Sequence, residues 1–156
     1  MIPIQRPGRP PIEIDSLVID FEGTLAQDGR VSPKSKDRMN LLAKRLRILV
    51  VVRNDEEKVR TILRRVDAEI LRSCEGESGR LKAELIEKLG KDRTAVLGNG
   101  ADDAALFEEA ALSLCILGRE GASAEALRKA DVVFPSVVDA LEFLLKPLRQ
   151  MATLGQ

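Results

Sequence analysis

The feature that most constrains the fold of this chain is an alternation between short apolar runs and longer segments with a helical pattern. The runs are rich in valine, isoleucine and leucine, and the clearest of them, I-L-V-V-V at residues 48–52, has no polar residue. A strand without polar alternation is buried on both faces, which is typical of a parallel sheet covered by helices. Strands are predicted at residues 17–20, 48–52, 68–71, 94–97, 112–117 and 131–134.

Helical segments fill the gaps between these strands. Ser32 and Pro33 are typical of an N-cap and a first helical position, Asn54 or Asp55 is expected to cap the next helix, and Gly90 to end the third. The alternation predicts an α/β fold with three layers, a Rossmann-like parallel sheet with helices on both faces. Helices are expected at residues 34–46, 56–65, 81–89, 104–111, 122–129 and 137–146, with Pro147 ending or kinking the last.

The first 15 residues differ from the alternating part, because four prolines fall within the first eleven positions. Residues 2–5 and 12–15 flank R-P-G-R-P-P, and this segment is expected to be either an N-terminal edge β-hairpin or a partner-binding arm. The chain has 156 residues and no internal repeat, so residues 1–156 are expected to form a single domain.

Composition excludes several classes of function. There is no histidine, which removes Ser-His-Asp and Cys-His catalysis and every histidine metal site. Lys+Arg and Asp+Glu are equal at 25 each, and Trp and Tyr are absent, so neither nucleic acid nor a membrane surface is an expected partner. With no apolar run long enough to span a bilayer and no signal-peptide pattern at the start, a cytoplasmic location is expected.

Acidic residues follow three of the predicted strands, where ligands of open α/β sheets bind, so the strand ends are expected to share one rim. The first strand ends in Asp20 and Glu22, and Arg53, Asn54 and Asp55 follow the strand at 48–52. Asp102 and Asp103 follow the strand at 94–97, and Lys82 lies in the helix before it. Mg²⁺ would relieve the repulsion between these acids, and the lysine would neutralise part of a transferring phosphoryl group. A purely structural interpretation is also open, in which the acids serve a first helical turn, G-N-G is a tight turn and the lysine is solvated.

The stretches D-F-E-G-T-L at residues 20–25 and G-N-G-A-D-D at residues 98–103, together with Lys82, resemble motifs of the haloacid-dehalogenase (HAD) superfamily. Over nearly its full length the chain resembles small soluble P-type ATPase-like HAD proteins. The resemblance implies an HAD-like fold in which Asp20 is the nucleophile that forms an aspartyl-phosphate. Lys82 would then offset the charge of Asp20 and of the phosphoryl group, as in phosphoryl transfer generally.

The same resemblance implies a Mg²⁺ cofactor. Its ligands would be Asp20, the backbone carbonyl of Glu22 and the carboxylate of Asp103, with Asn99 at a metal position where aspartate is usual. Asn99 lowers the negative charge around the metal, so weakened Mg²⁺ affinity is expected. Thr24 would stabilise the loop and belongs to the expected phosphate-binding set.

Two further positions depart from the pattern. Glu22 stands where phosphatases have an aspartate that acts as general acid and base, and its stem is one methylene longer. Val52 stands where Ser or Thr usually contacts the phosphate, so Arg53 or Asn54 is expected to bind phosphate instead. A solvent-facing Arg53 is the competing interpretation.

The segments between Asp20 and Val52, and between Val52 and Lys82, are too short for a lid domain, so the site is expected to be capless. Either a bulky substrate or a neighbouring subunit of a homo-oligomer would then cover it. We expect a Mg²⁺-dependent HAD phosphohydrolase that acts through an aspartyl-phosphate on an unidentified phosphorylated substrate. Two alternatives stay open: a catalytically weak or inactive HAD-fold binding or regulatory module, and a regulator with a long-lived aspartyl-phosphate.

Overall fold

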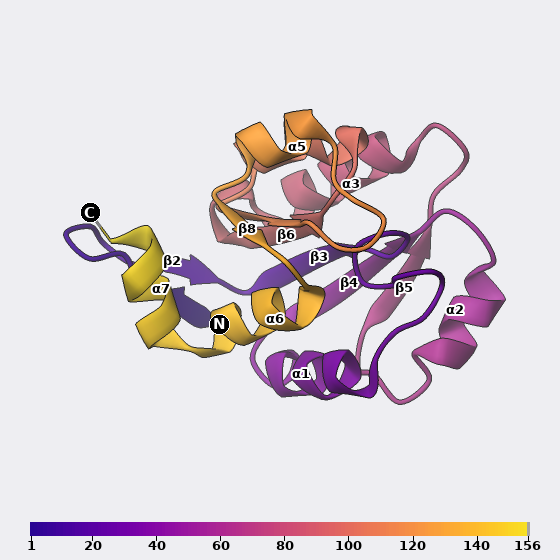
Figure 1. Ribbon diagram of the computed structural model, residues 1–156, viewed down its shortest axis with the longest axis horizontal. Coiled ribbons are helices and arrows are strands. Elements are labelled where there is room, and N and C mark those ends of the chain that lie inside the picture. Colours follow the sequence, from indigo (N-terminus) through magenta and orange to yellow (C-terminus); the bar gives the residue numbers. More distant parts are fainter. Residues whose placement is uncertain (156) are drawn as a thin grey trace.

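A computed structural model of the chain describes residues 1–155 and contains a six-stranded, all-parallel sheet (Figure 1). The predicted α/β class and all six predicted strands are confirmed. In order across the sheet the strands are β5 (Glu69–Arg72), β4 (Arg47–Val52), β3 (Ser16–Asp20), β6 (Thr94–Gly98), β7 (Leu112–Ile116) and β8 (Val132–Phe134).

Helices cover both faces of the sheet and complete three layers (Figure 1). The helices are α1 (Pro33–Ala43), α2 (Glu56–Ile62), α3 (Ser78–Leu89), α4 (Ala104–Glu109), α5 (Ala124–Lys129), α6 (Val137–Leu145) and α7 (Pro147–Leu154). Side chains of α1, α2 and α6 pack in one apolar cluster, and side chains of α3, α4 and α5 pack in a second cluster on the other face. In the described part of the chain no helix is long and apolar enough to cross a membrane.

The central strand β3 shows why the apolar runs lack alternation. All five of its residues are buried, because Leu17 and Ile19 face one cluster while Val18 faces the other. Strand order runs from β3 to β4 and β5 on one side and to β6, β7 and β8 on the other. The carboxyl end of β3 is therefore a topological switch point, the usual place for a ligand in such a sheet, and Asp20 is its last residue.

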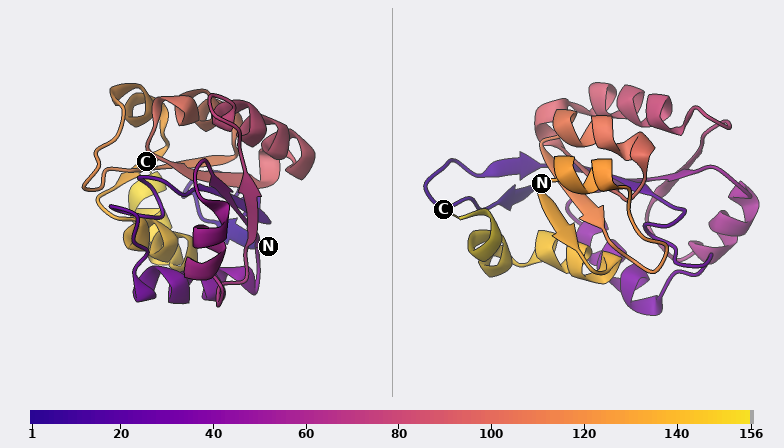
Figure 2. Two further views of the ribbon diagram at one scale, coloured as in Figure 1. Left: turned by 90° about the vertical axis from the view of Figure 1, so that its right-hand side faces the viewer. Right: turned by 45° about the horizontal axis from the view of Figure 1, so that its top comes forward.

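The N-terminal segment forms the predicted hairpin, from β1 (Ile2–Ile4) and β2 (Ile12–Ile14). It is a separate two-stranded antiparallel sheet rather than an edge of the main one. Gln5 donates its backbone N–H to Gln150 Oε1 of α7 at 2.9 Å, and both views in Figure 2 place the hairpin beside α7. The hairpin and α7 lie at the end of the sheet opposite the carboxyl end of β3 (Figure 1).

Several helix ends differ from the prediction: α1, α2 and α4 end two or three residues early, α5 begins two residues late, and two larger differences concern α3 and the end of the chain. The third helix begins at Ser78 rather than residue 81, since Gly79 packs closely on the backbone of Asp102 and this tertiary contact holds an extra turn. The helix before Pro147, α6, ends at Leu145, within one residue of the predicted end, but Pro147 also occupies the first position of a new helix, α7, that was not predicted. The Ser32 and Asp55 caps form as predicted.

Candidate active site

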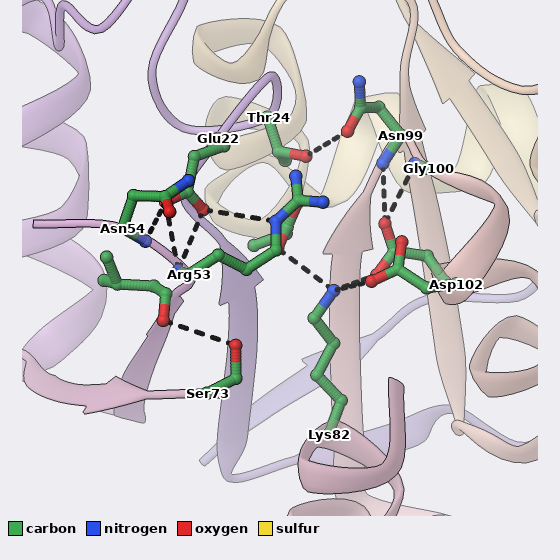
Figure 3. A network of polar contacts seen from close by, with 12 residues as sticks. Glu22, Thr24, Arg53, Asn54, Ser73, Lys82, Asn99, Gly100 and Asp102 are labelled. Carbon is green, nitrogen blue, oxygen red and sulfur yellow. Dashed lines mark hydrogen bonds and ion pairs between the residues drawn. The ribbon is translucent and has the colours of Figure 1, made fainter. Parts of the chain in front are cut away.

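Residues from four elements meet at the carboxyl edge of the sheet (Figure 3). The loop after β3 supplies Glu22 and Thr24, the turn after β4 supplies Arg53 and Asn54, the loop after β6 supplies Asn99, Gly100 and Asp102, and α3 supplies Lys82. The structure thus brings together the residues that the strand-end argument predicted would share one rim.

Lys82 lies at the centre of this cluster and is completely buried. Its Nζ lies 2.5 Å from Asp103 Oδ1, 3.0 Å from Asp20 Oδ1 and 3.4 Å from Asp102 Oδ2. Burial lowers the pKa of Lys82, but the carboxylates of Asp103 and Asp20 outweigh it, so the pKa lies above its ordinary value. Lys82 is therefore a permanent buried cation, and the interpretation of a solvated helix charge is excluded.

The Asp20 carboxyl group is 2% exposed and poorly satisfied. Burial raises its pKa to about 7, with Asp103 adding to the shift and Lys82 opposing it. Although the Lys82 ammonium is close, Asp20 Oδ1 accepts no hydrogen bond from the described residues. A buried oxygen in this state costs free energy, which the nearby Lys82 ammonium partly offsets.

Asp103 organises the loop after β6. Its Oδ2 accepts the backbone N–H groups of Asn99 and Gly100, both at 3.0 Å, while Oδ1 contacts Lys82. A side chain at Gly98 would collide with the Asp103 carboxylate, which explains the glycine there. Asp102 is more exposed, and its pKa is lowered because attraction to Lys82 outweighs the effect of burial.

Asn99 and Thr24 connect two loops. Thr24 Oγ1 donates to Asn99 Oδ1 at 3.1 Å, and Asn99 Nδ2 donates to the carbonyl of Gly121 at 3.0 Å. Gly23, at φ 76°, leaves room for the Asn99 side chain. These bonds agree with a loop-stabilising role for Thr24. They use the Asn99 oxygen and the Thr24 hydroxyl internally, so they give no support to Asn99 as a metal ligand or to Thr24 as a phosphate ligand.

The Glu22 carboxylate binds the backbone of the turn after β4 (Figure 3). Oε1 accepts the N–H groups of Arg53 and Asn54, each at 3.0 Å, and Oε2 accepts the Arg53 N–H at 3.3 Å. The Arg53 guanidinium Nε is 3.7 Å from Oε2. Two of the expected phosphate-binding residues, Arg53 and Asn54, are thus present at the rim, where their backbone amides and the Arg53 guanidinium face an anion, the Glu22 carboxylate. Sequence reasoning missed these amides because backbone donors leave no signature in residue type.

Two open hollows adjoin the cluster. One, of about 520 Å³, is lined by Glu22, Arg53, Ser78 and Asp102 among others, and the second, of about 830 Å³, lies on the other side of Arg53. Between Asp20 and Lys82 the chain holds only α1, β4, α2 and β5 with their connections. Across the described residues nothing in those connections forms a lid domain, as the segment lengths predicted.

The donor set is compatible with a divalent cation. Among residues 1–155 no group of three or more acidic or cysteine side chains is already gathered as a metal cage. Mg²⁺ needs only one or two carboxylates and keeps several waters. The three carboxylates around one ammonium carry a net charge of −2 when all four groups are ionised, and Asp20 Oδ1 lacks a hydrogen bond. A doubly charged cation would balance the charge of this cluster, and Asp20 fits as a carboxylate ligand. Both oxygens of Asp103 are already engaged, by Lys82 and by the Asn99 and Gly100 amides, so these contacts give no support to Asp103 as a second ligand.

The sequence and the structure of the chain are similar to those of known proteins. No protein-family model matches it. An uncharacterized protein of Methanocaldococcus jannaschii is 34% identical over 76 residues, which cover 46% of this chain and 82% of that protein.

Solved structures share the fold. A putative HAD family hydrolase from Streptomyces avermitilis has a TM-score of 0.68 at 19% identity, covering 85% of this chain and 88% of its own. The 3-deoxy-D-manno-octulosonate 8-phosphate phosphatase from Moraxella catarrhalis, in complex with magnesium, phosphate and KDO, has a TM-score of 0.73 at 12% identity, covering 90% and 89%. The chain therefore belongs to one family with the M. jannaschii protein, and its fold is that of the HAD superfamily.

Proposed function

We propose that the protein is an HAD-type phosphohydrolase that uses Mg²⁺ and forms an aspartyl-phosphate on Asp20. The observation that carries the proposal is the buried Lys82 ammonium among three carboxylates at the switch point of the sheet, next to an Asp20 oxygen without a hydrogen bond. An arrangement of this kind suits phosphoryl transfer, in which positioning and charge stabilisation do most of the work.

In the proposed first step an oxygen of the ionised Asp20 carboxylate attacks the phosphorus of a phosphate monoester. An O–P bond to Asp20 forms, the bond to the alcohol breaks, and its electron pair leaves with the alcohol oxygen, which takes a proton from Glu22 or water. Water then attacks the phosphorus of the aspartyl-phosphate and gives a proton to the Glu22 carboxylate or to solvent. The O–P bond to Asp20 breaks, its electron pair returns to the carboxylate oxygen, and inorganic phosphate leaves.

The residues of this chain would divide the work as follows. Lys82 would stabilise the Asp20 carboxylate and the charge that develops on the phosphoryl group. The amides of Arg53 and Asn54, with the Arg53 guanidinium, would hold phosphate oxygens. Asp20 would bind Mg²⁺, which when bound would supply positive charge to the transferring group.

The identity of the phosphate monoester is not part of this proposal. The open rim in the described chain supports the expectation of a substrate, or a second subunit, that covers the site. Homo-oligomer formation, a cytoplasmic location and the narrower resemblance to P-type ATPase-like proteins stay predictions.

A non-hydrolytic binding or regulatory module is the second candidate. Two observations favour it: Val52 offers no hydroxyl at the end of β4, and the Glu22 carboxylate is engaged with backbone amides instead of pointing to solvent as a free acid. A phosphoryl-accepting regulator with a stable aspartyl-phosphate has the same residues and differs only in the rate of the second step.

Hydrolysis of p-nitrophenyl phosphate, with Mg²⁺ or with EDTA, tests the proposal in the wild type and in Asp20→Asn. Asp67→Asn is a matched control, since it is the same chemical change at an exposed residue away from the rim. We expect metal-dependent turnover in the wild type and the control and none in Asp20→Asn. Turnover that persists in Asp20→Asn would contradict the assigned nucleophile. Incubation with a labelled phosphoryl donor separates the two alternatives. A phosphoryl group that stays bound to Asp20 without turnover would favour the phosphoryl-accepting regulator. Neither turnover nor a bound phosphoryl group would favour the non-hydrolytic binding module.

A further inference from the structure

The turn after β4 has the form of an anion nest. Two successive backbone N–H groups, those of Arg53 and Asn54, converge on one oxygen of Glu22, a residue 31 positions away in sequence. These amides do not belong to the first turn of α2, which begins at Glu56 and is capped by Asp55 through the Lys58 N–H at 3.1 Å. The two amides are therefore not used by the helix, and they bind an anion from elsewhere in the chain, the Glu22 carboxylate.

The nest lies beside the nucleophile. β4 is the hydrogen-bonded neighbour of β3, with Val51 opposite Asp20, and Phe21 donates its N–H to the Val51 carbonyl at 3.0 Å. Neighbouring strands are about 4.8 Å apart, so an anion on the Arg53 amide, two residues beyond Val51, is within about two such spacings of Asp20. The nest therefore lies at the rim where a phosphate monoester that approaches Asp20 would enter.

We propose that Glu22 is a resident occupant of this phosphate site: in the free protein its carboxylate takes the place of a substrate phosphate oxygen, and phosphate binding displaces it. The inference rests on the proposed function and deepens it. Glu22 and phosphate cannot share the two N–H groups, because each donates one strong hydrogen bond and both anions are negative. The displaced carboxylate is then free to take up a proton from water and pass it to the oxygen of the leaving alcohol, so Glu22 first competes with the substrate and then acts on it.

The extra methylene of glutamate is what allows the Glu22 carboxylate to reach the two amides. An aspartate at residue 22 would reach about 1.5 Å less far. The bonds to Arg53 and Asn54 are 3.0 Å long, and hydrogen bonds do not survive a lengthening of that size. Only the longer acid can occupy the nest, so replacing it by the usual aspartate should open the phosphate site.

The test measures binding of inorganic phosphate by calorimetry at a fixed Mg²⁺ concentration, in the wild type, Glu22→Ala and Glu22→Asp. Glu120→Ala is the matched control, because Glu120 lines the same hollow and carries the same charge but does not contact the two amides. We expect both Glu22 variants to bind phosphate at least about tenfold more tightly than the wild type, and Glu120→Ala to change affinity less than about threefold. A second readout is the ¹⁵N shift of the Arg53 and Asn54 amides, which should move on phosphate addition and move at lower concentration in Glu22→Ala.

Equal affinities in Glu22→Ala and Glu120→Ala, weaker binding in both Glu22 variants, or no phosphate binding by any protein would overturn the inference. Together with the hydrolysis assay described above, this measurement separates the failure of the inference from the failure of the proposed function. Tighter phosphate binding without hydrolysis would leave Glu22 as the occupant of a binding module's site. Hydrolysis through Asp20 with unchanged phosphate affinity would keep the enzyme and remove the role given to Glu22.

Discussion

Replacing Asp20 with asparagine should stabilise the metal-free protein at neutral and alkaline pH. Burial raises the pKa of the Asp20 carboxyl to about 7 in the folded protein, against an ordinary value of 3.8. The folded state therefore holds a proton that the unfolded chain releases, and stability present below pH 3.8 is lost as pH rises through 7. Asparagine cannot ionise and escapes this loss.

The size of the effect follows from the shift. About three pKa units at 1.36 kcal/mol each correspond to about 4 kcal/mol, fully expressed above pH 7. The attraction of Lys82 is already contained in that pKa, because it opposes the shift. Groups that do not interact with Asp20 cancel in the difference between the two free energies of unfolding, so the difference reports on Asp20 and its charged neighbours Lys82 and Asp103.

Urea denaturation in EDTA at several pH values between 4 and 8.5 measures this difference directly. We expect the free energies of the wild type and Asp20→Asn to be close near pH 4 and to separate by up to about 4 kcal/mol at pH 8, with the variant more stable. For a chain of this size that is a rise in Tm of roughly 10 °C. A difference that does not change with pH, or a wild type that is more stable at pH 8, would refute the account of a desolvated carboxylate. Asp67→Asn should follow the wild-type curve throughout.

Three further outcomes are expected. Mg²⁺ should raise the Tm of the wild type at pH 8 and leave Asp20→Asn nearly unchanged in a thermal-shift titration, since a ligand stabilises only the state that binds it; equal shifts would place the ion elsewhere. Lys82→Ala leaves buried carboxylates without their cation and should cost about 3–5 kcal/mol in urea denaturation, whereas Lys88→Ala, at an exposed lysine of the same helix, should cost less than about 0.5. Gly23→Ala should cost about 1–2 kcal/mol, because φ is 76° and the new Cβ would lie 2.8 Å from Asn99 Nδ2; an unchanged midpoint would show that the loop relaxes.

Much of the secondary structure follows from local sequence. The strands β3, β4 and β6 were predicted to within one residue, because continuous apolar runs are incompatible with a solvent-facing element. Helix starts at Ser32 and Asp55 follow from side chains that accept a nearby backbone N–H. The extra first turn of α3 was missed because it depends on packing against Asp102. The separate helix α7 was missed because a proline such as Pro147 is compatible with either the end or the start of a helix.

In the candidate site, too, some features could be predicted from the sequence and others could not. The gathering of Asp20, Lys82 and Asp103 could be predicted, because strand ends of a parallel sheet meet at one edge. The partners of Asn99 and Glu22 could not be predicted, because they lie on loops separated by more than twenty residues and depend on side-chain rotamers.

By itself the sequence determines which chemistry is available here. It has no histidine, and it places carboxylates, amides and one lysine at or near the predicted strand ends. The spacing of the buried runs predicts a parallel sheet, in which those ends converge. Only the tertiary structure decides how these groups behave. Desolvation depends on what is packed around a carboxylate, so the raised pKa of Asp20 arises from the layers that bury it. In the same way, the reach of Glu22 to the Arg53 and Asn54 amides exists only because β4 lies beside β3.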